Sequence, residues 1–247
     1  MGKHPTGAGS FAMKDDQKMI SEKGSISLFD PVIECKEVNT FRGPVHALRK
    51  VSLRVKPGIT CIVGPNGAGK TTLLKSIMGL LPVASGKITF LDQDITNRPA
   101  HKLAHMGLGY VPEDRRIYPD FSVVENILLG TWRRKKDPEK ILQQAYTFFP
   151  KLKDLSHSKG IHLSGGEQSM LAIARTLALE PRCLLLDEPL EGLAPVIRKR
   201  VAEGISELRA KGITTLTTAS DMSYVPDIAN AIYRMDRGEI VERQEKG

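Results

Sequence analysis

No apolar stretch in this 247-residue chain is long enough to cross a lipid bilayer, which takes about 18 consecutive residues. The longest apolar runs, such as 127–129 and 183–186, are far shorter. Residues 1–30 also lack the apolar stretch of a secretory signal peptide, because they mix glycine, serine, lysine and aspartate. We therefore expect no transmembrane helix, and we expect residues 1–30 to be a disordered or vector-derived tail.

Cysteine is scarce, which argues against a thiolate metal centre. The three cysteines, Cys35, Cys61 and Cys183, do not have metal-ligand spacing. At least two of them lie in runs that are typical of buried strands. We interpret them as small core residues of a protein in a reducing cytosol.

The net charge is +8, with an isoelectric point near 9.4. A basic chain of this kind suits nucleic acid, an anionic membrane surface or phosphate-bearing ligands. Its most concentrated basic run is Arg-Arg-Lys-Lys at 133–136, for which the simpler interpretation is a solvated turn before a helix. The charge alone therefore does not select a partner.

The apolar pattern alternates between strands and helices along 31–247. Helices are predicted after Lys70, from Ser164 and over 197–208. A lysine-rich helical pattern, interrupted by Pro138 and Pro150, predicts an inserted helical subdomain at about 114–163. Strands are predicted at 32–38, 49–55, 59–63, 87–91, 108–111, 183–186, 213–218, 231–235 and 238–241. This alternation predicts an α/β domain with a mostly parallel sheet.

A glycine-rich turn between a predicted strand and a predicted helix indicates a nucleotide site. Its glycines let backbone N–H groups converge on phosphate, and Lys70 supplies a positive charge between the β- and γ-phosphates. Thr71 is a magnesium ligand candidate and Thr72 a donor to the α-phosphate. The expected ligands are ATP and Mg²⁺, and the binding stretch comprises Gly64, Pro65, Asn66, Gly67, Ala68, Gly69, Lys70, Thr71 and Thr72.

Two acidic residues, Asp187 and Glu188, follow an entirely apolar strand. Carboxylates at the carboxyl end of a parallel strand face the crevice in which α/β sheets bind ligands. We expect Asp187 to hold Mg²⁺, through water, and Glu188 to act with Lys70 in catalysis as the general base for an attacking water. The alternative is two acidic residues that leave a strand for solvent.

A second glycine-containing turn, Ser164-Gly165-Gly166-Glu167, has two compatible interpretations. Ser164 and Glu167 have the spacing of a capping box for the helix that they begin. The two glycines at a helix N-terminus also make an anion site, because free N–H groups and the helix dipole favour negative charge there.

The order of the glycine turn, Leu-Ser-Gly-Gly-Glu-Gln at 163–168 and Leu-Leu-Leu-Asp-Glu-Pro at 184–189 resembles the ATP-binding cassette family, from about residue 32 to the end. Val-Pro-Glu at 111–113, with Arg115 and Arg116, and Gly-Leu-Ala-Pro at 192–195 are similar to ATP-binding subunits of branched-chain amino-acid importers. The resemblance implies a P-loop NTPase core, an antiparallel β subdomain and the inserted helical subdomain.

The same resemblance implies how the chain works. Two cassettes would pack head to tail, as a homodimer or a heterodimer, with ATP between the glycine turn of one and residues 164–167 of the other. Phe41 would stack on adenine, the alternative being a core phenylalanine. Transmembrane permease subunits would dock near the helical subdomain and the Glu113 loop, which places the chain in the cytoplasm on the inner face of the membrane, and no nucleic acid is expected.

The chain departs from the family pattern at three positions. Glu113, expected at the nucleotide and its metal, replaces a glutamine, Leu190 replaces a serine, and Ser220 stands where a switch histidine is usual. Serine is too short to bridge the γ-phosphate and Glu188, and it carries no charge. We therefore hypothesise slow hydrolysis at this site, with a regulatory cassette or a non-transport cassette as alternatives to an importer subunit. The transported substrate is not encoded in these motifs.

Overall fold

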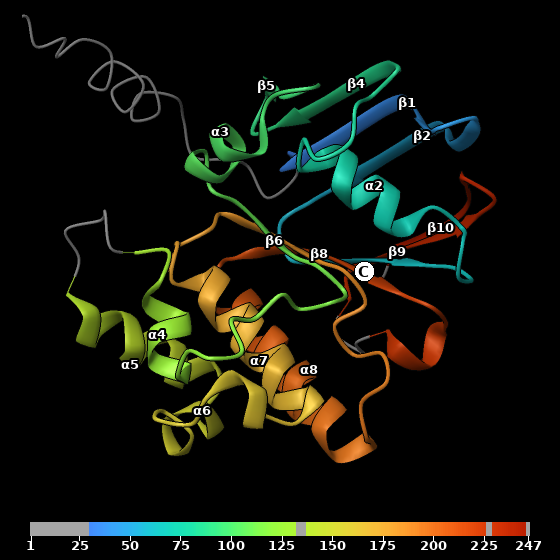
Figure 1. The fold of residues 1–247 in the computed structure, drawn as a ribbon. Helices are drawn as coiled ribbons and strands as arrows, with labels where there is room; N and C mark the ends of the chain where they lie inside the picture. The colour runs from blue at the N-terminus through green and yellow to red at the C-terminus, as the bar shows by residue number, and fades with distance from the viewer. Residues whose placement is uncertain (1–29, 132–136, 226–228, 246–247) are drawn as a thin grey trace, which may run out of the picture. The chain divides into compact units, whose positions relative to one another are not determined.

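The computed structural model describes residues 30–131, 137–225 and 229–245 (Figure 1). The predicted tail, apart from Asp30, and the basic run at 133–136 lie outside these ranges. No helix among the described residues is long and apolar enough to span a membrane. Cys35, Cys61 and Cys183 are buried, as expected, and burial raises the pKa of the Cys35 and Cys61 thiols to about 12.

A mostly parallel sheet carries the centre of the fold. Its described strands lie in the order β10-β9-β3-β8-β7-β6, with β10 antiparallel to β9 and the other neighbours parallel. The strands are β3 (Ile59–Val63), β6 (Leu108–Val111), β7 (Cys183–Leu186), β8 (Thr214–Ala219), β9 (Ala231–Asp236) and β10 (Glu239–Glu245). Every residue of β3, β7 and β8 is buried, because both faces of the sheet are covered.

A second sheet is antiparallel, with the described strands in the order β2-β1-β4-β5. Its strands are β1 (Ile33–Arg42), β2 (Val45–Val55), β4 (Ser85–Phe90) and β5 (Gln93–Asp94). The short strand β5 and the helix α3 (Ala100–His105) were not predicted from the sequence. Both are too short to produce a clear apolar period.

Helix α2 (Lys70–Ile77) packs between the two sheets (Figure 1). Its Leu73, Leu74 and Ile77 are fully buried in one cluster with residues of β1, β2 and β4 and with Leu185 of the parallel sheet. This packing anchors the helix that follows the glycine turn, so the turn has a fixed support on both sides.

Five helices belong to the core on the opposite face of the parallel sheet. In β7, Leu184 and Leu186 face these helices whereas Cys183 and Leu185 face α2, as the period-2 geometry of a strand requires. The helices are α4 (Val123–Leu128), α5 (Pro138–Phe148), α6 (Lys151–Asp154), α7 (Gly165–Leu177) and α8 (Pro195–Ala210). Two 3-10 turns, Gly160–His162 and Met222–Tyr224, complete the elements of the part of the chain that the structure describes.

The helical pattern expected from about residue 114 begins later in the structure. Helix α4 starts at Val123, after Ser122, whose hydroxyl and Glu125 form a capping box. Asn126 of this helix accepts a hydrogen bond from the Tyr118 backbone N–H at 2.9 Å and donates to the carbonyls of Tyr118 and Phe121. The preceding loop is therefore held by a buried amide instead of by helical hydrogen bonds.

We predict that Gly204→Ala destabilises the chain, although alanine is the better helix former. A Cβ at Gly204, in the middle of α8, would lie 2.2 Å from Cε1 of the buried Phe149. We expect the free energy of unfolding to fall by about 1–3 kcal/mol, measured by urea denaturation. Phe149→Leu added to Gly204→Ala should recover part of the loss, and a Gly204→Ala variant as stable as the wild type would contradict the packing.

Candidate nucleotide-binding site

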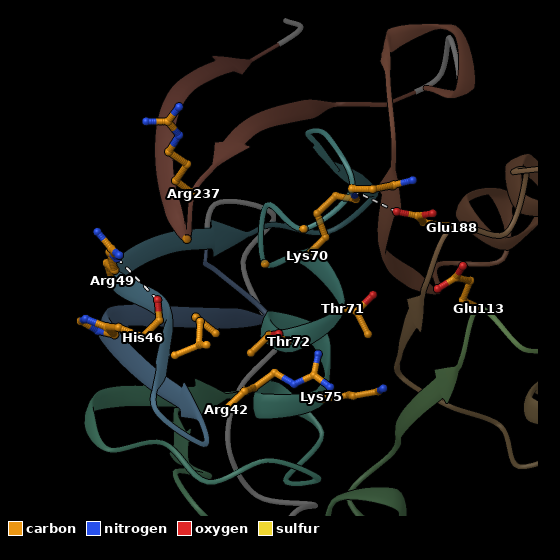
Figure 2. Close-up of a pocket in the computed structure, with 16 residues that line it drawn as sticks. Arg42, His46, Arg49, Lys70, Thr71, Thr72, Lys75, Glu113, Glu188 and Arg237 are labelled. Carbon is orange, nitrogen blue, oxygen red and sulfur yellow. Dashed lines mark hydrogen bonds and ion pairs between the residues drawn. The ribbon is translucent and has the colours of Figure 1, made fainter.

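A cavity of about 890 Å³ opens where the glycine turn meets β2, and sixteen residues line it (Figure 2). The turn contributes Asn66, Gly67 and Gly69, and α2 contributes Lys70, Thr71, Thr72 and Lys75. Gly69 has φ 110° and caps α2, and a Cβ at Gly64 would lie 2.0 Å from the Met235 carbonyl oxygen. Residues with side chains at these two positions would open the turn, so the glycines are structural requirements of the site.

Lys70 is buried at the base of the cavity and is fully hydrogen-bonded. Its ammonium group donates to the carbonyl oxygens of Gly64 at 2.6 Å and Pro65 at 3.1 Å. It also forms an ion pair with Glu188 Oε1 at 2.9 Å, drawn as a dashed line in Figure 2, and the two side chains are only 2% and 7% exposed. The two residues expected to act in catalysis are therefore in direct contact.

Asp187 is 1% exposed and accepts three side-chain hydrogen bonds. Thr71 and Thr218 donate to Oδ1, each at 3.0 Å, and the Tyr110 hydroxyl donates to Oδ2 at 3.1 Å. Burial and the negative charge of Asp187 raise the pKa of Tyr110, so its hydroxyl stays a donor. Asp187 is thus held in one orientation by three neighbours.

The residues proposed to bind Mg²⁺ have suitable chemistry. Thr71 Oγ1 and the Asp187 carboxylate lie side by side, and Glu113 lines the same cavity as Thr71. Hydroxyl and carboxylate oxygens of this kind suit Mg²⁺, which also keeps water and substrate phosphate in its shell. Among the described residues there is no cluster of three or more His, Cys, Asp or Glu that could hold a metal ion.

Phe41 is not a core residue, because 46% of its surface is exposed. Its ring stacks on His46, with the centroids 4.4 Å apart and the planes 12° from parallel. His46 lines the cavity and Phe41 does not. The structure therefore rejects the core interpretation of Phe41, and its stacking on adenine stays a prediction.

The mouth of the cavity is basic. Figure 2 shows the side chains of Arg42, His46, Arg49, Lys75 and Arg237 around the glycine turn, from both sheets and from α2. Sequence patterns did not identify these residues, because they come from four segments without a shared motif. Such a rim raises the local concentration of polyphosphate anions.

Residues 164–167 do not line the 890 Å³ cavity. Ser164 caps α7, and its hydroxyl and Glu167 form the predicted capping box, with Glu167 Oε2 accepting from the Ser164 N–H at 2.9 Å. Ser164 and Gly165 are exposed, and residues 164–167 are not among those that line the cavity. Within one chain, then, this turn and the glycine turn do not share a pocket.

Ser220 also lies outside the 890 Å³ cavity. It lines a smaller cavity of about 290 Å³ together with Val63, Gly64 and Pro65, on the strand side of the glycine turn. A contact between Ser220 and nucleotide therefore stays a prediction.

Comparisons with known proteins identify a family and relatives of this chain. The model of the ABC transporter family matches residues 48–191. The branched-chain amino acid transport ATP-binding protein BraG of Pseudomonas aeruginosa is 36% identical over 207 residues, which cover 83% of this chain and 89% of BraG. The lipopolysaccharide export ATP-binding protein LptB of Acidithiobacillus ferridurans is 35% identical over 202 residues, 78% of this chain and 82% of LptB.

Solved structures have the same fold. A dimeric ATP-binding cassette bound to ADP and Pi aligns with a TM-score of 0.77 at 24% identity, over 87% of this chain and 99% of that chain. The P-loop α/β fold expected from the motifs is therefore confirmed.

We predict that Thr218→Val destabilises the chain by about 1.5–3 kcal/mol, because Thr218 donates to the Asp187 carboxylate and accepts from the Glu188 N–H at 2.9 Å. Thr215→Val is the matched control, since Thr215 lies in the same strand, is fully buried and has a hydroxyl without a hydrogen-bond partner among the described residues. That control should be neutral or stabilising. Equal losses in urea denaturation of the two variants would contradict the network around Asp187.

Proposed function

Because the chain belongs to the ABC transporter family, we propose that it binds MgATP in the 890 Å³ cavity and couples ATP hydrolysis to transport across a membrane. One observation carries the proposal. Lys70, Thr71, Asp187 and Glu188, which come from two segments more than a hundred residues apart, form one contact network through the Lys70–Glu188 and Thr71–Asp187 pairs.

In this proposal the glycine turn binds the phosphates through its backbone N–H groups. The N-terminus of α2 adds its positive dipole end, and Lys70 and Thr72 contribute side-chain donors. Bound Mg²⁺ would neutralise the developing charge on the phosphate oxygens, and Thr71, Asp187 and Glu113 are the residues that would hold it. The basic rim favours entry of the nucleotide.

Glu188 is the proposed general base. In the structure its carboxylate is neutralised by Lys70. Phosphate oxygens compete for the same ammonium group, so nucleotide binding would release the Glu188 carboxylate to orient water and accept its proton. The ion pair thus keeps the base inactive until phosphate replaces it as the partner of Lys70.

We also propose that the working unit contains two cassettes. Ser164 and Gly165 are exposed, and residues 164–167 do not line the cavity, so the anion site at the start of α7 is available to a second copy or to a related cassette. The dimeric cassette with ADP and Pi supports this arrangement by its shared fold. A transporter role further requires permease subunits, which would hold the chain at the cytoplasmic face of the membrane.

The proposed cargo is an amino acid or a related small solute. The similarity to BraG and the Val-Pro-Glu and Gly-Leu-Ala-Pro segments support it. LptB, named for lipopolysaccharide export, is nearly as similar, so the cargo is best tested directly. Radiolabelled amino-acid uptake by vesicles that contain the chain and its permeases would support the proposal, and uptake unaffected by loss of the chain would refute it.

A second candidate is a cassette that binds ATP but hydrolyses it slowly, beside a more active partner. The observation that favours it is Ser220, a short neutral side chain outside the nucleotide cavity. In this case ATP binding alone would hold the two cassettes together.

We predict that Glu188→Gln lowers the steady-state ATPase rate by about 10²-fold or more, because an amide cannot accept the proton of water. ATP affinity should be retained or increased, since the substitution removes the carboxylate that competes with phosphate for Lys70. Calorimetry and phosphate release measure the two quantities. Glu203→Gln, at an exposed position on α8, is the control, and full activity of Glu188→Gln would exclude Glu188 as the base.

We predict that Ser220→His raises the ATPase rate if the second candidate is correct, because an imidazole can reach toward the phosphate and carry charge whereas the serine hydroxyl cannot. The rate is compared with that of the wild type at saturating MgATP. A wild-type rate of at least about 1 s⁻¹, near the low end of common enzyme turnover, that histidine does not increase would exclude slow hydrolysis.

A further inference from the structure

The loop that carries Glu113 has an unusual backbone. It runs from Val111, the last residue of β6, to Ser122, which caps α4, and Glu113 lines the 890 Å³ cavity (Figure 2). Arg115 has φ 58° and Arg116 has φ 45°, so two consecutive residues with side chains lie in the left-handed region. This conformation is uncommon for such residues and persists where the surrounding structure holds it. The loop therefore needs contacts that fix it.

The contacts inside the loop are few. The Arg115 N–H donates to the Pro112 carbonyl oxygen at 2.9 Å, and the Arg116 N–H donates to the Asp114 carbonyl oxygen at 2.6 Å. The Arg116 guanidinium also pairs with the Asp114 carboxylate, but both side chains are exposed, and ion pairs in water stabilise little. Further support for the two left-handed residues comes from another element.

That element is α7, through the side chain of Arg175. Nη1 of Arg175 donates to the Arg116 carbonyl oxygen at 2.8 Å, and Nη2 donates to the Arg115 carbonyl oxygen at 3.2 Å. The guanidinium carbon also lies 5.4 Å from the centroid of the Tyr118 ring. One planar side chain thus contacts both left-handed residues and the aromatic ring that follows them, across a separation of 59 and 60 residues for the two hydrogen bonds.

The charge of Arg175 is committed to these contacts. Arg175 is half-buried, and no carboxylate in the part of the chain that the structure describes forms an ion pair with it. A partly buried cation requires polar partners, and the two backbone carbonyl groups are the partners that it has here. The fixed fork of a guanidinium suits two adjacent acceptors, which the single ammonium group of lysine does not match.

We propose that Arg175 is a positioning residue for Glu113, because its hydrogen bonds to the Arg115 and Arg116 carbonyl groups fix the turn that keeps the Glu113 carboxylate at the cavity. The inference rests on the proposed function, in which Glu113 helps to hold Mg²⁺. Helix α7 also begins at the Ser164 turn, so one helix supports both that exposed turn and the Glu113 loop.

Hydrogen exchange tests the contact without turnover. The full-length wild type is compared by mass spectrometry with Arg175→Met, which keeps an unbranched apolar side chain but has no donor, and with Arg200→Met, an exposed control on α8. We expect backbone amides of residues 112–121 to exchange about tenfold faster or more in Arg175→Met, since two hydrogen bonds from a charged donor are lost. Residues 214–219 of β8 should be unchanged, and Arg200→Met should match the wild type.

Arg175→Lys keeps the charge without the fork and decides the matter if Arg175→Met exchanges rapidly throughout the chain. The proposal predicts faster exchange confined to residues 112–121 in the lysine variant, to a smaller extent than in Arg175→Met. Wild-type exchange of these residues in both variants would overturn the proposal, as would wild-type exchange in Arg175→Lys when Arg175→Met has lost its fold.

The Mg²⁺ requirement separates positioning from general stability. Arg175→Met should raise the Mg²⁺ concentration for half-maximal ATPase activity, with the affinity for ATP in the presence of EDTA unchanged in calorimetry. Added to Glu113→Ala, it should raise that concentration no further, because an absent carboxylate cannot be misplaced. Independent, additive effects of the two substitutions would refute positioning. A Glu113→Ala variant with the Mg²⁺ requirement of the wild type would instead refute the proposed role of Glu113, whatever the exchange of the loop.

Discussion

The parallel pairing of β8 with both β3 and β7 is the constraint on which the site depends. Val63 pairs with Ala219 and Leu186 pairs with Thr217, so the residues that follow β3, β7 and β8 emerge at one edge of the sheet. Val111 pairs with Leu186 and brings the start of the Glu113 loop to the same edge. Strand register brings the residues of the candidate site together, because its local motifs are far apart in the chain.

Charge balance at this edge follows from burial. Lys70 and Glu188 are almost fully buried, and removing either one would leave an uncompensated charge at high cost. The pair with Glu188 and the two carbonyl contacts satisfy the ammonium group. A triphosphate can displace these contacts since it offers more negative charge in the same place. In the proposed function, binding of nucleotide and release of the Glu188 carboxylate would therefore be linked by one cation.

Much of the fold and of the candidate site could be predicted from the sequence, for physical reasons that differ between elements. The strands at 59–63, 108–111 and 183–186 were predicted with the bounds that the structure has, because they are short, mostly apolar runs that are followed by glycine, proline or aspartate. The capping box at Ser164 was predicted because it is a local pattern. The α/β fold was predicted from the alternation of strands with helices along the chain.

Residues that no sequence motif identifies owe their places to contacts between segments that are far apart in the chain. Tyr110 and Thr218 hold Asp187 from the neighbouring strands β6 and β8, and neither belongs to a motif. The Glu191 N–H donates to the Glu188 carbonyl oxygen in a turn with a left-handed backbone at Glu188, a non-glycine residue, which no residue pattern predicts. Phe41 is exposed because it lies at the hairpin end of β1, beyond Asn39, the last residue of β1 that pairs with β4.

The core shared by β7 and the helices on its face has a mechanical consequence. Ile127 of α4, Phe148 of α5 and Leu152 of α6 belong to the same buried cluster as Leu184 and Leu186 of β7, the strand that ends directly before Asp187. Close-packed interiors deform little, so a displacement of these helices would strain the end of β7. The helices and the segment that contains Asp187 and Glu188 therefore share one close-packed support, so their positions depend on each other.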